Sequence, residues 1–390
     1  NTLNITGGNH VDEDSLLSLH EAVTATTITL GAAGAGQATL KTMTATTAIA
    51  GTVDSASGTD GAGLTLIDAD IATQFSGNVG ASVAIEKMDI AAIKVDLDGA
   101  TNQIESILFS ADGELEFGTG ADQTLTGAIT ATTNEHGLVE NGSTTGTLTI
   151  SGTIGAEDKR VKEIALLDNT DTTFQSAVFA LDLDIDTAAA DDVTTFTIGN
   201  VIGDDGTTAG ALDVAGGTMV LDTAVVSGTT VFDTKEVNNA DAGVELRALV
   251  IQPSANFTNG TVTFIDGATA ATIDAADVAG VSVTDTALTD YTVNITAAVA
   301  DVTITAAAKT AGATATELSI STNEATAVHQ LMEAAITGDT TLMSALNDSL
   351  TGVNSGVAQT TTDLAKQASP QTDLITGSSV AAQAVTGSVQ

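Results

Sequence analysis

A short pattern repeats along most of this chain and limits what it can fold into. Between about residue 24 and residue 320, runs of about five residues with alternating apolar positions are each followed by a cluster of Gly, Asp, Asn, Thr or Ser. Gly146–Ser151 reads GTLTIS, and Asp301–Thr305 reads DVTIT. Alternation places one face in a core and the other in water, and Thr suits the wet face of a strand. The pattern therefore predicts many short β-strands separated by turns.

The length and composition indicate how such strands are arranged. At 390 residues the chain exceeds the usual limit for one compact core, so it forms several domains or a fold that lengthens without thickening. Aromatic residues are only 3% and tryptophan is absent, which favours a thin core of Val, Ile, Leu and Ala. Because 43% of the residues are hydrophobic, the chain is expected to fold despite its large charge.

A longer self-similarity supports a repeat architecture. The segment Ser76–Ala81, SGNVGA, recurs as Ser151–Ala156, SGTIGA, and upstream Gly51–Val53 matches Gly127–Ile129 at nearly the same offset. A repeat of about 75 residues would hold about three coils of 20 to 30 residues each. We therefore predict an all-β fold, a right-handed parallel β-helix with a short α-helical cap at its C-terminal end. The alternative is a chain of β-sandwich modules.

The character of the sequence changes near residue 321. Ser321–Glu324 has the Ser-x-x-Glu spacing of a helix capping box, and apolar residues follow it at helical spacing. We expect an N-terminal segment or cap at 1–23 and a solenoid at 24–320 that contains a duplicated unit at about 45–100 and 121–175. A helical cap at 321–369 and a linker-like tail at 370–390 would follow.

The charge balance excludes several classes of partner. There are 50 acidic and 10 basic residues, giving a net charge of -40. Binding to nucleic acid or anionic lipid needs Lys and Arg, so cations are the natural partners. The chain has no cysteine, which suits an exported protein. It starts at Asn1 without a leader, and it has no apolar stretch of about 18 residues, so we expect it to be processed, with no transmembrane segment.

Carboxylates spaced two residues apart recur along the predicted strands. Residues two apart in a strand share a face, so each such group lines its carboxylates along the outside. Calcium takes six to eight oxygen ligands and would relieve their mutual repulsion. The candidate Ca²⁺ ligands are Asp68, Asp70, Asp96, Asp98, Asp182, Asp184 and Asp186. The alternative is a solvated acidic face without a specific ion.

Three of the ten basic residues lie close together at Lys159, Arg160 and Lys162. On so negative a body, a cationic spot could dock the acidic surface of a neighbouring copy, so these residues are candidates for an interface. Local pairing with the flanking acids is the alternative interpretation.

The sequence carries no recognisable catalytic motif. The four histidines are scattered without metal-ligand spacing, and no nucleophile elbow, phosphate-binding loop or convincing dinucleotide fingerprint occurs. Most of the lysines and arginines stand alone, although a lyase or hydrolase on a β-helix would need them beside carboxylates. We therefore expect no enzyme and no required cofactor.

Two stretches carry a resemblance to a known family. The Gly-Thr-rich segment Gln123–Leu167 is similar to repeats of the large rickettsial surface-layer autotransporters. The end of the chain, Ala365–Gln371 and Ala381–Val389, resembles the segment that links an autotransporter passenger to its translocator. The resemblance implies a mature passenger of a type V autotransporter, cleaved and retained at the cell surface, with a parallel β-helix fold.

Together these features predict a structural protein of the bacterial cell surface. The leading expectation is a surface-layer (S-layer) or surface-coat subunit that self-assembles by lateral contacts bridged by Ca²⁺. Such a subunit would be extracellular and associated with the outer membrane, through an outer-membrane component or lipopolysaccharide. The alternatives are an adhesin passenger that binds a host or a glycan, and a structural protein of a phage or an extracellular filament.

Overall fold

The fold is that of a computed structural model. It describes residues 2–329 except 8–13, 33–35, 44–46, 57–64, 92, 119–120, 144, 157, 168–170, 186–192, 197–200, 203–210, 215, 222–226, 234–243, 247, 254–256, 267–279, 287, 297–300, 320, 324 and 327–328.

Two long parallel sheets form most of the molecule. A 12-stranded sheet consists of β2 (Ser15–Leu19), β4 (Ala38–Thr42), β7 (Thr65–Ala69), β9 (Ile85–Ile90), β11 (Thr101–Phe109), β13 (Gln123–Ala131), β15 (Thr147–Ile150), β17 (Asp171–Phe174), β19 (Val193–Phe196), β22 (Thr218–Leu221), β25 (Val250–Gln252) and β27 (Ser282–Val283). A 10-stranded sheet consists of β5 (Thr47–Ile49), β8 (Thr73–Phe75), β10 (Lys94–Leu97), β12 (Glu114–Phe117), β14 (Leu138–Asn141), β16 (Val161–Leu166), β18 (Phe179–Ile185), β20 (Val201–Ile202), β21 (Ala211–Val214) and β24 (Val244–Leu246). Successive strands of the chain alternate between these sheets, which is the topology of a β-solenoid.

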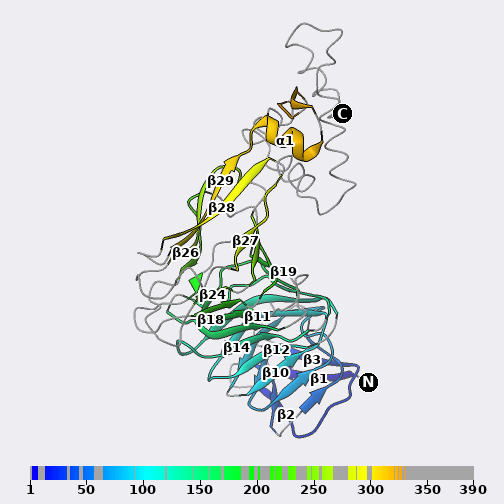
Figure 1. Cartoon of the computed structure of the whole chain (residues 1–390). Helices are drawn as coiled ribbons and strands as arrows, with labels where there is room; N and C mark the ends of the chain where they lie inside the picture. Colours follow the sequence, from blue (N-terminus) through cyan, green and yellow to red (C-terminus); the bar gives the residue numbers. More distant parts are fainter. Residues whose placement is uncertain are drawn as a thin grey trace, which may run out of the picture.

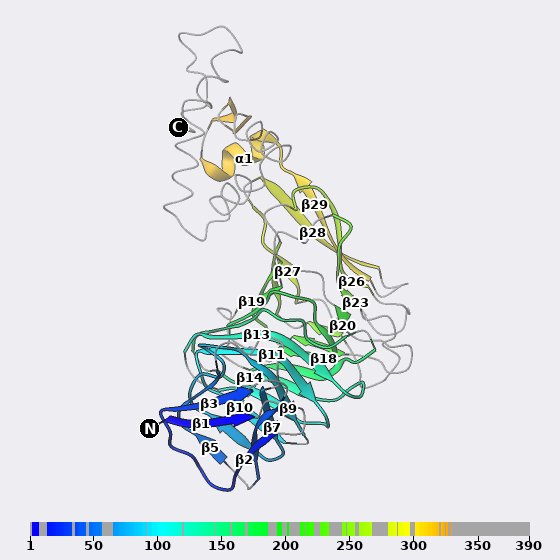
Figure 2. The ribbon, with the colours of Figure 1, turned by 180° about the vertical axis from the view of Figure 1, so that it is seen from behind.

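A third face closes the coils. It begins as the parallel sheet of β1 (Thr2–Gly7), β3 (Thr27–Ala32) and β6 (Thr52–Ser55), and single bridges continue it from Val53 through Val79 to Asn102. Figure 1 shows the coils stacked from the N-terminus (blue) to the green strands, and Figure 2 shows the same stack from behind.

The register gives the length of each coil. Ile107 pairs with Ile129, and Ile150 pairs with Phe174, so these coils advance by 22 and 24 residues. This confirms the prediction of coils of 20 to 30 residues in a parallel β-helix, and the alternative of β-sandwich modules is wrong. Inward-facing aliphatic residues stack on one another along the tube. In one such column Leu40, Ile67, Met88, Ile107 and Ile129 are fully buried.

The duplicated motifs form equivalent corners. Val79 of SGNVGA bridges Val53 and Asn102, and Ile154 of SGTIGA bridges Ile129 and Val178. Each is followed by a glycine with positive φ, Gly80 at 72° and Gly155 at 68°. The backbones also approach closely, because a Cβ at Gly77 would lie 2.6 Å from the Gly51 carbonyl oxygen. Only glycine fits where successive corners stack this tightly.

The solenoid starts earlier than the sequence predicted. β1 pairs in parallel with β3, and β2 pairs in parallel with β4, so the described part of segment 1–23 belongs to the first coil. Its short alternating runs, TLNITG and SLLSL, are the same signal as in the later strands.

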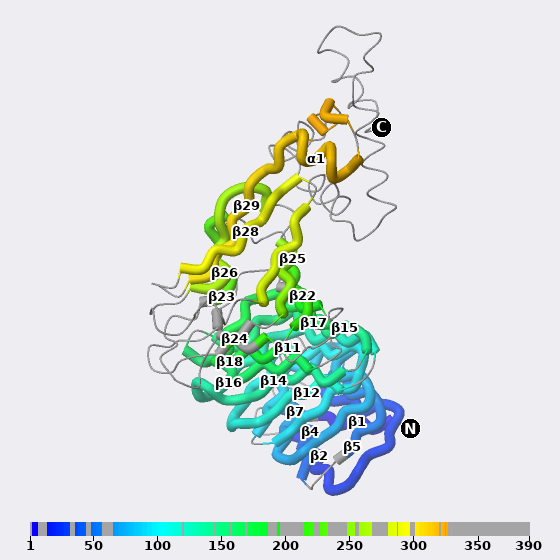
Figure 3. The backbone as a smooth tube through the Cα atoms, viewed as in Figure 1, coloured from blue at the N-terminus to red at the C-terminus, as the bar shows by residue number. Residues whose placement is uncertain are grey.

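The C-terminal part departs from the predicted solenoid. β23 (Thr230–Asp233), β26 (Gly260–Asp266), β29 (Asp301–Ala308) and β28 (Thr289–Thr296) form a separate 4-stranded sheet. β29 is antiparallel to both β26 and β28, which lie beyond the coils in Figure 3. Alternation places residues on a face but does not distinguish parallel from antiparallel pairing, so the sequence pattern could not show this change.

A short helix, α1 (Ala311–Leu318), follows the last strand. Its N-cap is Thr310, whose hydroxyl accepts a hydrogen bond from the Ala313 amide at 3.2 Å. The helix lies ten residues before the predicted start of the cap. Residues 322–323, 325–326 and 329 are also helical, whereas the rest of the predicted cap and the tail at 370–390 lie outside the described residues. Within the described part of the chain, no helix has the length and apolarity that a membrane crossing requires.

Candidate functional site

Carboxylates gather in a row on the outer face of the 10-stranded sheet. Asp96 of β10 pairs with Glu116 of β12, which pairs with Glu140 of β14. The residues on either side of each acid, such as Val95 and Leu97, are fully buried. The acids therefore point away from the core, and strand spacing of about 4.8 Å holds them close together. We call Asp96, Glu116 and Glu140 the acidic row.

The row continues along the sheet in register. After Ala165 it reaches Asp184, which pairs with Asp213, and Asp213 pairs with Glu245. Acidic residues thus occupy six of the seven positions between β10 and β24. A parallel stack aligns equivalent positions, so a position that is acidic in most coils gives a line of acidic residues along the sheet, interrupted at Ala165.

A second row lies beside it and contains the compensating cation. Lys94 Nζ lies 2.7 Å from Glu114 Oε1 and 2.6 Å from Glu116 Oε2. Carboxylate oxygens of Glu114, Glu116 and Glu140 all lie within 4.8 Å of one another. Burial disfavours the charged form of Lys94, but the hydrogen bonds to Glu114 and Glu116 outweigh it and raise the pKa of this lysine. The charge of Lys94 therefore partly neutralises the three carboxylates of Glu114, Glu116 and Glu140.

The remaining acids of the row are held under electrostatic strain. Burial, the Asp98 charge and the Glu116 charge raise the pKa of Asp96 to about 7. Its Oδ1 atom is buried and has no hydrogen-bond partner among the described residues. Burial and the charge of Glu114 likewise raise the pKa of Glu140. At neutral pH this surface carries more negative charge than its own residues neutralise.

Two glycines leave the space that these carboxylates occupy. Gly118 follows β12, and a Cβ there would lie 3.2 Å from Asp96 Oδ1. Gly142 follows β14, and a Cβ there would lie 3.1 Å from Glu116 Oε1. A side chain at either position would make the neighbouring carboxylate shift by a few tenths of an ångström.

The structure separates the predicted calcium ligands into different surroundings. Asp96, Asp98, Asp182 and Asp184 share the outer face of the 10-stranded sheet, where Asp98 accepts a hydrogen bond from Gln74 Nε2 at 2.8 Å. Asp68 and Asp70 lie at β7 of the other long sheet, where Lys41 Nζ lies 2.6 Å and 2.5 Å from their carboxylates. Asp186 lies outside the described residues.

Sequence reasoning missed Glu114, Glu116, Glu140 and Lys94. The spacing of Glu114 and Glu116 is the same two-residue signal as in the aspartate pairs and could have been noticed. Glu140 has no acidic residue two positions away in its strand, because β14 reads LVEN whereas β12, one coil earlier, reads ELEF. Only the register of β12 and β14 brings Glu140 to this site.

The three residues of the predicted cationic interface lie in different surroundings, and an interface at the two lysines stays a prediction. Arg160 is 1% exposed, so it cannot contact another molecule and its assignment to an interface is wrong. Its backbone amide donates to Asn134 Oδ1 at 2.9 Å, which packs its loop against the previous coil. Lys159 and Lys162 are exposed. Lys162 Nζ lies 3.4 Å from Asp112 Oδ2, two coils earlier in the chain.

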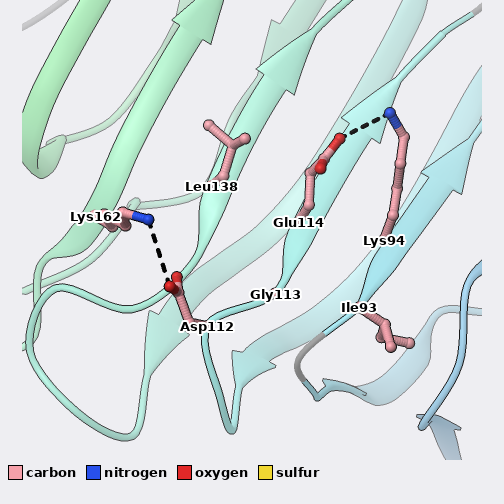
Figure 4. Close-up of a pocket in the computed structure, with 7 residues that line it drawn as sticks. All are labelled: Ile93, Lys94, Asp112, Gly113, Glu114, Leu138 and Lys162. Atoms are coloured by element: carbon pink, nitrogen blue, oxygen red, sulfur yellow. Dashed lines mark hydrogen bonds and ion pairs between the residues drawn. The ribbon is translucent and has the colours of Figure 1, made fainter.

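An open groove of about 340 Å³ crosses the sheet beside the acidic row. Lys94 and Lys162 line its two sides, and each reaches an acid in the groove, Glu114 and Asp112 respectively (Figure 4). Leu138 lies between them. The groove therefore places paired charges of both signs at the border of the negative surface.

No family model, curated protein or solved structure matches this chain.

Proposed function

We propose that this chain is a structural subunit of a bacterial surface coat, an S-layer protein whose copies associate laterally through the 10-stranded sheet. The observation that carries the proposal is the acidic row, in which Lys94 is the one lysine that pairs with these carboxylates within the described part of the chain. Carboxylates repeated at equivalent positions of successive coils suit repeated contacts between identical copies better than binding of a small ligand.

Calcium is the bridging ion in this proposal. The carboxylates of one face already repel one another, because two unit charges 4.8 Å apart cost about 3.5 kcal/mol at an effective dielectric constant of about 20, and a second acidic face would add to this repulsion. Calcium prefers oxygen ligands, six to eight in number and loosely arranged. One copy offers only a few carboxylate oxygens that Lys94 does not already bind, so a second copy would complete the coordination.

The likeness to autotransporter passengers supports a location. A passenger of a type V autotransporter is carried to the outside of the outer membrane, where a coat is needed. We therefore propose an extracellular, outer-membrane-associated protein anchored by an outer-membrane component or lipopolysaccharide. The absence of cysteine is compatible with such a compartment.

Assembly of the purified protein tests this proposal. We expect ordered sheets or filaments in electron micrographs with millimolar Ca²⁺ and dispersed protein with a chelator, and release from cells on chelation. The double variant Glu116→Gln, Glu140→Gln should need several-fold more Ca²⁺ or fail to assemble. Glu105→Gln is the matched control, since Glu105 is exposed on the other long sheet. Equal assembly in Ca²⁺ and chelator, or equal effects of both variants, would contradict the proposal.

A further inference from the structure

The groove beside the acidic row has the size of a small-ligand site. Its volume of about 340 Å³ lies at the lower end of the range for pockets that hold small molecules, roughly 300 to 1,000 Å³. Four charged side chains line it together with two aliphatic ones, Ile93 and Leu138. The lateral contact proposed above uses Glu116 and Glu140 and gives this groove no role.

The backbone around the groove is fixed from coil to coil. The Glu114 amide donates a hydrogen bond to the Ile93 carbonyl at 2.7 Å, and the Leu138 amide donates to the Gly113 carbonyl at 2.9 Å. Each of these bonds ties a residue that lines the groove to the preceding coil. The side chains of the groove therefore stand on a rigid backbone, which a precise binding site requires.

The two ion pairs in the groove differ in how firmly they are held. Lys94 Nζ lies 2.7 Å from Glu114 Oε1 and 2.6 Å from Glu116 Oε2, so this lysine has two close partners. Lys162 Nζ lies 3.4 Å from Asp112 Oδ2, and these two side chains are 48% and 52% exposed. An ion pair this long and this exposed contributes little to stability. The pair of Lys162 and Asp112 can therefore open at little cost.

Asp112 is already oriented for a new partner. Its Oδ1 atom accepts a hydrogen bond from the Gly137 amide at 3.4 Å, and its Oδ2 atom faces Lys162 across the groove (Figure 4). When the ion pair opens, Asp112 Oδ2 can accept a hydrogen bond from an ammonium group and Lys162 Nζ can donate to an anionic group. The same side of the groove thus offers one acceptor and one donor of opposite charge.

The surrounding charge selects the ligand. The chain has a net charge of -40, and Glu163 pairs with Leu138 in the sheet register beside the groove, so a simple anion is repelled. A simple cation would replace Lys162 at Asp112 without bringing a new partner for this lysine. A zwitterion meets both requirements, because its ammonium group binds Asp112 while its anionic group binds Lys162.

We propose that this groove binds small zwitterions that carry a primary ammonium group and a phosphate or carboxylate group. One ion pair within the protein is replaced by two between protein and ligand, and Ile93 and Leu138 contact the carbon atoms that join the charged groups. Two sources share this chemistry: a free molecule such as phosphoethanolamine, and the ethanolamine headgroup of a membrane lipid. The lipid source would attach a surface coat to its membrane and rests on the proposed function.

Calorimetric titration of the dispersed protein in a chelator tests the groove, since no calcium-bridged contact forms under these conditions. Phosphoethanolamine should bind with a dissociation constant of about 1 to 10 mM, as expected for a ligand of this size. Ethanolamine and inorganic phosphate each supply a charge of only one sign, so each should bind at least about tenfold more weakly.

Two variants locate the contact. Asp112→Asn weakens the acceptor for the ammonium group and Lys162→Met removes the donor for the anionic group, so each should weaken binding at least about fivefold. The matched controls are Asp158→Asn and Lys159→Met, which change exposed charges of the neighbouring loop outside the groove. Circular dichroism checks that each variant keeps its β-structure.

Co-sedimentation with lipid vesicles in the same chelator separates the two sources. Vesicles that contain phosphatidylethanolamine should bind the protein if the headgroup is a ligand, whereas pure phosphatidylcholine should not, because its quaternary ammonium cannot donate a hydrogen bond to Asp112. Binding of free phosphoethanolamine without binding to either vesicle supports the groove with a free ligand.

Three results overturn the proposal. They are no binding of phosphoethanolamine at concentrations up to about 50 mM, binding of ethanolamine as tight as that of phosphoethanolamine, and equal losses in Asp112→Asn and Asp158→Asn. None of them affects the calcium-bridged contact, because that contact is tested separately by assembly with Ca²⁺.

Discussion

Replacing Asp96 with asparagine should make the protein more stable at neutral pH. The carboxylate is faced by Asp98, which follows β10, by Glu116 on β12 and by Lys94. Gln74 on β8 binds the neighbouring Asp98. Burial and the surrounding acids raise its pKa from 3.8 to about 7. The substitution Asp96→Asn would keep the shape of the side chain and remove the charge that this environment disfavours.

The direction in which stability changes with pH follows from the pH at which Asp96 loses its proton in the unfolded and in the folded state. The unfolded chain loses it near pH 3.8, while the folded protein keeps it until about pH 7. The folded state therefore binds more protons in this window, and the free energy of unfolding falls as the pH rises from about 4 to 7. The full difference in pKa would be worth about 4 kcal/mol. Because the side chain is partly exposed, we expect solvent to reduce this to about 1 to 2 kcal/mol.

Urea unfolding followed by far-UV circular dichroism at pH 4 to 8.5 measures this effect. Asp96→Asn should raise the free energy of unfolding by about 1 to 2 kcal/mol at pH 8 and leave it within about 0.5 kcal/mol at pH 4. The control is Asp112→Asn, whose carboxylate is 52% exposed and should change stability little. If Asp96→Asn has no effect at pH 8, or lowers stability there, the acidic row is not under electrostatic strain.

Three further predictions concern the corners, the compensating lysine and the core. Gly152→Val should lower the free energy of unfolding by about 2 to 4 kcal/mol, because its Cβ would collide with the Gly127 backbone. Gly228→Ala, with φ of 87° but no atom within 4 Å of its Cβ, should cost only about 1 to 2 kcal/mol in the same urea titration. Lys94→Met should destabilise the protein by about 1 to 2 kcal/mol at pH 7, because it leaves the Glu114 and Glu116 carboxylates without their cation; an unchanged free energy of unfolding would contradict the electrostatic explanation. Phe117→Ala removes a fully buried ring and should cost about 3 to 5 kcal/mol, and hydrogen exchange should show the loss first in the neighbouring coils.

Much of the solenoid could be predicted from the sequence, because its signals are local. Strands such as Thr147–Ile150 are predicted by the alternation of apolar and polar residues. Gly80 and Gly155 mark equivalent corners through the repeated SGNVGA and SGTIGA motifs. The antiparallel pairing of β28 and β29 could not be predicted in this way. Their alternation is the same as that of the parallel strands, and only the pairing partner differs.

The candidate site depended on longer-range geometry. The pairs at Asp96 and Asp182 were found because two-residue spacing within a strand is visible in the sequence. Glu140 reaches Glu116 only through the register between coils of unequal length, which no local pattern encodes. Arg160 looked like a surface cation, yet it is buried between loops of successive coils. Burial of a single charged residue in a corner depends on how neighbouring coils stack.

The most direct test of the proposed function is an electron cryomicroscopy reconstruction of assemblies grown with Ca²⁺. The proposal predicts rods that lie side by side with their 10-stranded sheets facing each other, and density for an ion between Glu116 or Glu140 of one copy and the carboxylates of the next. Assemblies in which this face points to solvent, or which grow unchanged in a chelator, would contradict it.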